Sequence, residues 1–315
     1  MASIGFLWCS AAHAKGTGTG APKAPCDVID LMPEFWRAWD AGQGQPPPER
    51  VQTLRRRFLD AHIDLYRAAL GDDHLTDKQL GNLVQLVGMA EAPMRRISKE
   101  LPEVVCAEIP RLRRFGRFPT EHNIYIWPSL LTSDGTLRPI EGRLRSFLGP
   151  DVIAYVRPHA KSHRAFVDHE LFHLLHSQEN AEADVILKAD VPPLYQTLWV
   201  EGLPTFFSRD QNPTAPLSEI LASDTLEAQA APRLAEWAAQ LAARFDSTDE
   251  KDLKTYFWFR TEPGEVPVRV GYYVGMRVAQ DVYETHGRDW KKMIALAGPA
   301  LKEAVRRSLE KLSRK

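Results

Sequence analysis

Two histidines four residues apart, with a glutamate directly after the first, constrain this chain more than any other feature. His169, Glu170 and His173 form the pattern H-E-x-x-H. On an α-helix, residues i and i+4 lie on one face, so both imidazoles can reach a single metal ion. Neutral imidazole nitrogens suit Zn²⁺, and the adjacent glutamate can take a proton from a water beside the ion. The pattern therefore predicts a helix that carries two ligands of a zinc site.

A catalytic zinc site usually has three protein ligands, so a third ligand is expected downstream. Glu201 lies 28 residues after His173 and opens a helical pattern, so a second helix crossing the first would bring its carboxylate to the site. Glu179 is the competing candidate, because a longer zinc motif places its third ligand at that spacing. That motif needs a glycine where this chain has His176. We therefore favour Glu201, and we expect His176 to lie beside the ligands or at the surface rather than to be an extra ligand.

The spacing of apolar residues predicts an α+β fold that is mostly helical. Helices are expected at 49–70, 76–89 (with Thr76 as N-cap), 91–98 and 103–115, and the motif itself lies on a helix expected at 162–176. After the motif, helical spacing recurs at 194–208, 217–222, 231–245, 249–258 and 267–283, followed by two short helices.

Two segments rich in β-forming residues precede the motif helix. Residues 122–127 and 151–156 predict strands, with a turn at 133–136, so a small sheet is expected above the motif helix. An extended peptide could pair with the edge of that sheet at either strand. Trp127 and Tyr155 would then flank the cleft, although both also fit the core.

The helix expected at 267–283 carries small residues and two tyrosines. Gly271, Gly275 and Ala279 are spaced by four and form a smooth stripe against which another backbone can pack closely. Tyr272 or Tyr273 could donate a phenolic hydrogen bond to an oxyanion. Adjacent helical residues point about 100° apart, so the sequence does not choose between the two phenols, or between this role and plain aromatic packing.

The N-terminus predicts export. Residues 4–12 are apolar, Ala12-His13-Ala14 has the small-x-small form of a signal-peptidase site, and a flexible polar linker follows, so we expect residues 1–26 to be a signal peptide and linker. Cleavage at Ala14 would leave Cys26 and Cys106, which either pair in an oxidising compartment or remain thiols. We expect a periplasmic or secreted protein, with a cytoplasmic one as the alternative.

The remainder of the chain, 27–315, is long enough for one large domain. We expect helices in 27–116, the sheet and active-site helix in 117–180, and helices again in 181–315. The formal net charge of −1 gives no indication of nucleic acid or of an anionic membrane as a partner. No apolar run approaches the length of a membrane-spanning helix.

Three segments resemble a known group of proteins. They are His169-Glu170-Leu171-Phe172-His173, Trp199-Val200-Glu201-Gly202-Leu203 and Gly271-Tyr272-Tyr273-Val274-Gly275. They look like little-characterised bacterial proteins that are described as predicted zinc-dependent proteases of the gluzincin type. The resemblance implies a zincin-like fold in which His169, His173 and Glu201 bind one zinc ion and Glu170 is the base.

The resemblance has one departure. Better-known gluzincins often carry an aspartate four residues after the ligand glutamate, hydrogen-bonded to a zinc-bound histidine, and this chain has Thr205 there. Asp168 is too close in sequence to His169 to be assigned that role, so another acceptor is expected.

The expected function is a zinc metallopeptidase that acts on peptides or proteins. One alternative is a metal-stabilised binding or scaffold protein without catalysis, and another is a zinc hydrolase of a non-peptide amide. Glu170 argues against the first alternative, because a structural zinc needs no base beside its ligands.

Overall fold

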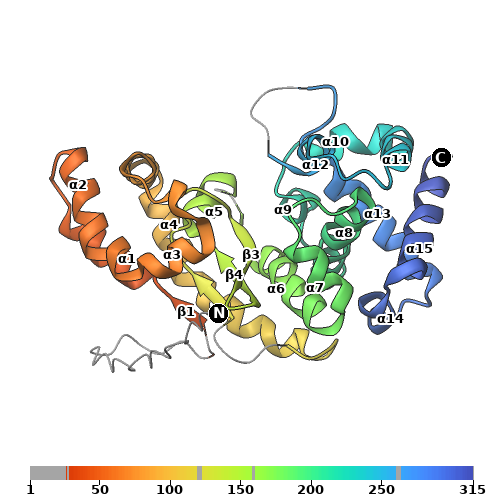
Figure 1. Ribbon diagram of the computed structural model, residues 1–315, viewed down its shortest axis with the longest axis horizontal. Coiled ribbons are helices and arrows are strands. Elements are labelled where there is room, and N and C mark those ends of the chain that lie inside the picture. Colours follow the sequence, from red (N-terminus) through yellow and green to blue (C-terminus); the bar gives the residue numbers. More distant parts are fainter. Residues whose placement is uncertain (1–25, 27, 119–122, 158–159, 260–263, 315) are drawn as a thin grey trace, which may run out of the picture.

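The structure, a computed structural model, describes residue 26 and residues 28–118, 123–157, 160–259 and 264–314 (Figure 1). These residues form a mostly helical α+β fold with one small mixed sheet, as the sequence predicted. The predicted signal peptide and linker lie outside the described residues, except for Cys26. Within the described part of the chain, no helix combines the length and apolar character needed to cross a membrane.

The sheet has four strands in the described residues: β1 (Val28–Asp30), β2 (Ile124–Ile126), β3 (Gly135–Ile140) and β4 (Arg143–Leu148). Their spatial order is β1-β2-β4-β3; β1, β2 and β4 are parallel, and β3 is antiparallel to β4. Glu141 and Gly142 join β3 to β4 with positive φ values of 52° and 77°, the backbone of a tight two-residue hairpin. Because β3 stands at the end of the strand order and pairs only with β4, it is an edge strand.

The predicted strand at 151–156 is wrong, and the predicted turn at 133–136 includes the start of β3. Residues Pro150–Val156 form helix α5. Proline at the first helical position favours a helix start, and the Asp151 carboxylate is buried where it accepts hydrogen bonds from Ser129 N (2.9 Å) and Leu131 N (2.9 Å). As a result Tyr155 lies 66% exposed on α5, whereas Trp127 is fully buried in the core.

The N-terminal helices are α1 (Met32–Ala41), α2 (Pro47–Leu54), α3 (Ile63–Leu70) and α4 (Asp77–Leu112). Helices α3 and α4 contact the sheet, and α2 packs against α1 and α4. A π-helical turn and a 3₁₀ turn separate α2 from α3, so the segment predicted as one helix is interrupted. Gly71 ends α3 with φ 79°, and the Thr76 hydroxyl caps α4 by accepting from Gln79 N, as predicted. The three helices expected across 76–115 are one helix with a kink at Ala90, because its buried apolar face continues past the prolines.

Helix α6 (Arg164–Glu179) carries the H-E-x-x-H motif and lies between the sheet and α8 (Leu194–Gln211), with α7 (Ala181–Lys188) between them in sequence (Figure 1). Apolar side chains are buried on every side of α6, which is typical of a helix inside a core.

Helices α9–α15 complete the part of the molecule drawn on the right of Figure 1. They are α9 (Leu217–Leu221), α10 (Leu226–Ala230), α11 (Leu234–Ala243), α12 (Glu250–Phe257), α13 (Val270–Thr285), α14 (Trp290–Ala295) and α15 (Gly298–Leu312).

Helices α8 and α13 cross with their backbones in direct contact. A Cβ at Gly275 would lie 2.6 Å from Leu198 O and 2.8 Å from Gly202 Cα. Gly275 of the predicted stripe therefore packs against α8, at the residue next to Glu201, whereas a Cβ at Gly271 would lie 2.5 Å from the Phe257 ring of α12.

Cys26 and Cys106 form a disulfide that joins the start of the described chain to α4, at a sequence separation of 80. Of the two states that the sequence left open, the structure has the paired one.

Candidate metal centre

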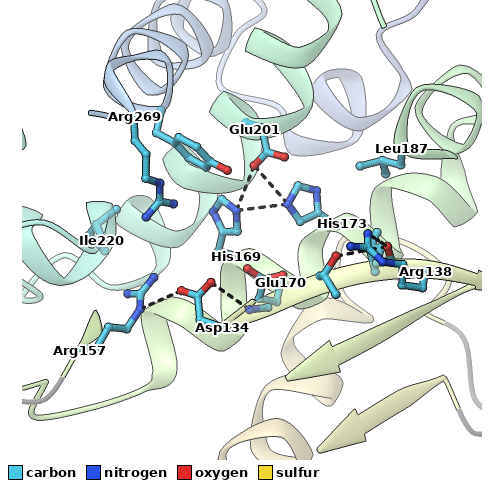
Figure 2. Close-up of a pocket in the computed structure, with 14 residues that line it drawn as sticks. Asp134, Arg138, Arg157, His169, Glu170, His173, Leu187, Glu201, Ile220 and Arg269 are labelled. Atoms are coloured by element: carbon cyan, nitrogen blue, oxygen red, sulfur yellow. Dashed lines mark hydrogen bonds and ion pairs between the residues drawn. The ribbon is translucent and has the colours of Figure 1, made fainter. Parts of the chain in front are cut away.

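His169, His173 and Glu201 converge at one point, where α6 passes α8 (Figure 2). The two Nε2 atoms are 3.2 Å apart, and Glu201 Oε2 is 3.6 Å from His169 Nε2 and 3.7 Å from His173 Nε2. Zinc binds such donors at about 2.0–2.2 Å in tetrahedral geometry, which separates neighbouring donors by roughly 3.3 Å. The three donors therefore fit a zinc ion with little adjustment.

The protonation states of the three groups also suit a cation. Burial, followed by the neighbouring His169, lowers the pKa of His173 to about 4, although Glu201 opposes this. Burial alone would raise the pKa of Glu201, but His173 and hydrogen bonds from His169 and Tyr272 lower it to about 2. At neutral pH the site presents neutral His173 and a carboxylate, which are metal-ligating forms.

Glu170 faces the same cavity, which has a volume of about 290 Å³, from the side of the sheet (Figure 2). Its side chain lies against Gly135 at the start of β3, where a Cβ would be 2.2 Å from Glu170 Cδ. Burial, then Asp134 and then Glu201 raise the pKa of Glu170. The bare backbone at Gly135 thus makes room for a carboxylate beside the ligand atoms.

The two tyrosines of α13 have different surroundings. Tyr272 lines the cavity with its ring centroid 6.1 Å from that of His169, whereas Tyr273 is buried and its phenolic oxygen accepts from Arg277 Nη1 at 3.4 Å. Burial, then Glu201, raises the pKa of Tyr272, so its phenol keeps its proton at neutral pH. Of the two candidates, the structure brings only Tyr272 to the cavity.

Thr205 lies one helical turn after Glu201, on the side of His169. Its hydroxyl donates to Glu201 O at 2.7 Å and lies 3.4 Å from His169 Nδ1. Because the hydroxyl proton is committed to the carbonyl, the oxygen can accept from His169 Nδ1–H, which leaves Nε2 unprotonated for a metal. The acceptor that the sequence expected elsewhere is therefore at Thr205 itself.

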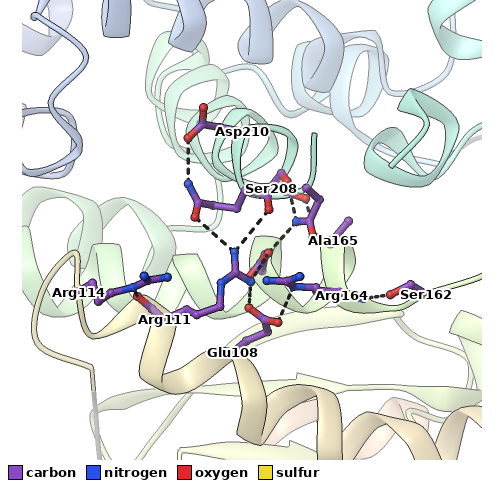
Figure 3. A network of polar contacts seen from close by, with 11 residues as sticks. Glu108, Arg111, Arg114, Ser162, Arg164, Ala165, Ser208 and Asp210 are labelled. Atoms are coloured by element: carbon purple, nitrogen blue, oxygen red, sulfur yellow. Dashed lines mark hydrogen bonds and ion pairs between the residues drawn. The ribbon is translucent and has the colours of Figure 1, made fainter. Parts of the chain in front are cut away.

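Asp168 is buried and belongs to an ionic network around Glu108 and Arg111, both labelled in Figure 3. Its carboxylate accepts from Asn212 Nδ2 at 2.7 Å and lies 3.5 Å from Arg111, which also pairs with Glu108. Burial, then Glu108, raises the pKa of Asp168 to about 7. The network joins α4, α6 and the end of α8 and so helps to fix the two ligand-bearing helices relative to each other.

Neither alternative ligand reaches the site. Glu179, at the end of α6, accepts from Arg117 N at 2.6 Å and from Arg117 Nε at 3.1 Å. His176 is buried, 1% exposed, and neither of its ring nitrogens has a partner among the described residues. Burial, then His173, lowers the pKa of His176 to about 3. A surface position for His176 is thus wrong, because α6 is buried all round.

Several charged residues that line the cavity were not predicted from the sequence. Asp134 precedes β3 and Arg138 lies within it, Arg157 follows α5, and Arg269 precedes α13 with φ 61°. Arg157 Nε lies 3.6 Å from Asp134 Oδ2, and Arg269 Cζ lies 4.2 Å from the Tyr272 ring centroid. No sequence motif marks the three arginines; the Asp-Gly pair of the expected turn was the one signal nearby.

The fold and the site together define a helical α+β protein with an H-E-x-x-H helix and a glutamate donor on a crossing helix. No protein-family model, curated protein or solved structure matches the chain.

Proposed function

We propose that the protein is a zinc-dependent metallopeptidase with a zincin-like fold. The observation that carries the proposal is the convergence of His169, His173 and Glu201 within 4.8 Å, with Glu170 in the same cavity. A structural zinc site is closed by four protein ligands, whereas a catalytic one has three and stays open. Three donors at the wall of a cavity fit the catalytic kind.

The cavity's own residues have separate chemical tasks. A zinc ion held by the three donors would lower the pKa of a water and polarise a carbonyl group. Glu170 is placed to take the proton of the attacking water and pass it to the leaving nitrogen. Tyr272 is placed to donate a hydrogen bond to the oxyanion, and Thr205 fixes the imidazole of His169.

An extended peptide is the substrate that the sheet favours. β1 and β3 are the edge strands, and of the two only β3 lines the cavity, with residues 134–138, so a peptide could pair with β3 above α6. The sequence placed this edge at 122–127 or 151–156. In the structure β2 is internal and 151–156 is helical, so we propose β3 as the strand that pairs with the peptide instead.

We also propose that the protein is exported. The disulfide between Cys26 and Cys106 supports this proposal, because disulfides persist mainly in oxidising compartments.

The proposal is tested by metal analysis and a peptide screen on the same preparations. We expect about one zinc per chain, hydrolysis that a chelator abolishes and zinc restores, and loss of both zinc and activity in Glu201→Gln. Glu179→Gln is the matched control, because it removes the competing glutamate and should keep both properties. Zinc without hydrolysis over a broad peptide panel would favour a binding protein, and absence of zinc from the wild type would overturn the proposal.

A further inference from the structure

A second cavity, of about 480 Å³, lies beside the metal centre. Asp134, Arg269 and Tyr272 line both cavities, so these three side chains lie between the two. We call the second cavity the apolar subsite, and its apolar walls come from α4, α5, α12 and the segments next to them: Leu86, Leu131, Val152, Tyr155, Phe257 and Phe259.

The apolar subsite exposes aromatic surface to solvent. Tyr155 is 66% exposed and Phe259 is 62% exposed, and both line it; Trp258, between two lining residues, is 51% exposed. These are three of the five exposed large hydrophobic residues in the described part of the chain. Isolated apolar side chains at a surface are ordinary, but a cluster around a cavity is typical of a binding site.

Tyr272 links the apolar subsite to the ligands. Its ring centroid lies 5.8 Å from that of Phe257 on one side and 6.1 Å from that of His169 on the other. One residue of an extended peptide spans about 3.3–3.6 Å. A substrate side chain in the apolar subsite would therefore belong to a residue at, or one or two positions from, the bond nearest the metal centre.

We propose that the apolar subsite binds a large apolar side chain of the substrate close to the cleaved bond and so determines specificity. This inference rests on the proposed peptidase function. The occupant is apolar because the walls beyond the three shared residues are mainly aliphatic and aromatic, whereas the metal cavity carries the charged groups. Burial of a leucine or phenylalanine side chain there corresponds to a preference of about tenfold to a hundredfold over a small or acidic one.

The test is a zinc-loaded digestion of a peptide library, with every cleavage site identified by mass spectrometry. We expect large apolar residues at one position near the cleaved bond, at least about tenfold over glycine and aspartate. Val152→Trp fills the apolar subsite without touching the metal cavity and should abolish this preference; Leu86→Arg, from a different wall, should do the same. Val185→Trp on α7 is the matched control, because Val185 is exposed and lines neither cavity.

The outcomes separate this inference from the function on which it rests. Zinc-dependent cleavage without an apolar preference, or a preference that both variants keep, would refute the role of the apolar subsite in specificity. The proposed peptidase function would be unaffected. If the wild type cleaves nothing, the peptidase proposal fails. Binding of N-acetylphenylalaninamide to the zinc-free protein then tests whether the apolar subsite binds a large apolar side chain. Saturable binding that Val152→Trp weakens at least about tenfold, with N-acetylasparaginamide not bound, supports it; no binding overturns it.

Discussion

The close contact of α8 and α13 allows the effect of a substitution at Gly275 on stability to be estimated from distances. Substituting Gly275→Ala places a Cβ 2.6 Å from Leu198 O, whereas ordinary van der Waals contact begins at 3.4 Å. The obstacle is backbone, which cannot rotate away, so the helices must separate by about 0.8 Å. Overpacking of this kind typically costs about 1–3 kcal/mol, more than the roughly 1 kcal/mol that alanine gains over glycine in a helix.

The separation also affects the metal centre, because α8 carries Glu201 and Thr205 while α13 carries Tyr272. Zinc sites tolerate ligand displacements of only about 0.2 Å. We therefore expect Gly275→Ala to lower the free energy of unfolding of the zinc-free protein by up to about 2 kcal/mol, the overpacking cost less the propensity gain, and to weaken zinc binding at least about tenfold.

Urea unfolding and zinc titration against a competing chelator measure the two effects. Gly81→Ala in α4 is the matched control, since nothing lies within 4 Å of the added Cβ, and it should stabilise the protein by about 0.5–1 kcal/mol. If Gly275→Ala is as stable as Gly81→Ala and binds zinc as tightly as the wild type, the close crossing does not position the site.

Three further predictions concern separate parts of the molecule. Thr205→Val should weaken zinc binding about tenfold in the same chelator titration while Thr205→Ser keeps it, because only the hydroxyl orients His169; equal affinities would contradict this role. Replacing Cys26 and Cys106 by serine should lower the free energy of unfolding by up to about 4.5 kcal/mol, the chain-entropy value for an 80-residue loop, and should make urea unfolding insensitive to reductant. Burial raises the pKa of Asp30 from 3.8 to about 6, so the folded state holds a proton that the unfolded state releases, and stability falls as pH rises through this window. The stability gained by Asp30→Asn in urea unfolding should therefore be small at pH 4 and complete above about pH 7; a gain independent of pH would refute the assignment.

The parts of the site that could be predicted from the sequence were those that follow from the periodicity of a helix. His169 and His173 share a helix face by spacing alone, and the small residues at Gly271 and Gly275 indicated a close helix contact. The partner in that contact, Gly202, was not predicted, because a helix crossing depends on tertiary packing. The choice between Tyr272 and Tyr273 likewise required the position of α13 against α8.

The sheet could be predicted only in part. Residues 124–126 carry a clear β pattern, but β3 and β4 contain arginines and a proline, and their turn is Glu-Gly rather than a stronger hairpin signal. Residues 151–156 have a β-rich composition, yet Pro150 and the buried Asp151 start a helix there. Local propensity was overridden by the proline at the first helical position and by the burial of Asp151.

Peptide hydrolysis by wild type and Glu170→Gln at equal zinc occupancy tests the proposed catalytic site most directly. Glu170 does not belong to the three donors, so we predict about one zinc per chain in both proteins and a rate of hydrolysis at least about a hundredfold lower in Glu170→Gln than in the wild type. Equal hydrolysis rates in the two proteins, with zinc present in both, would contradict it.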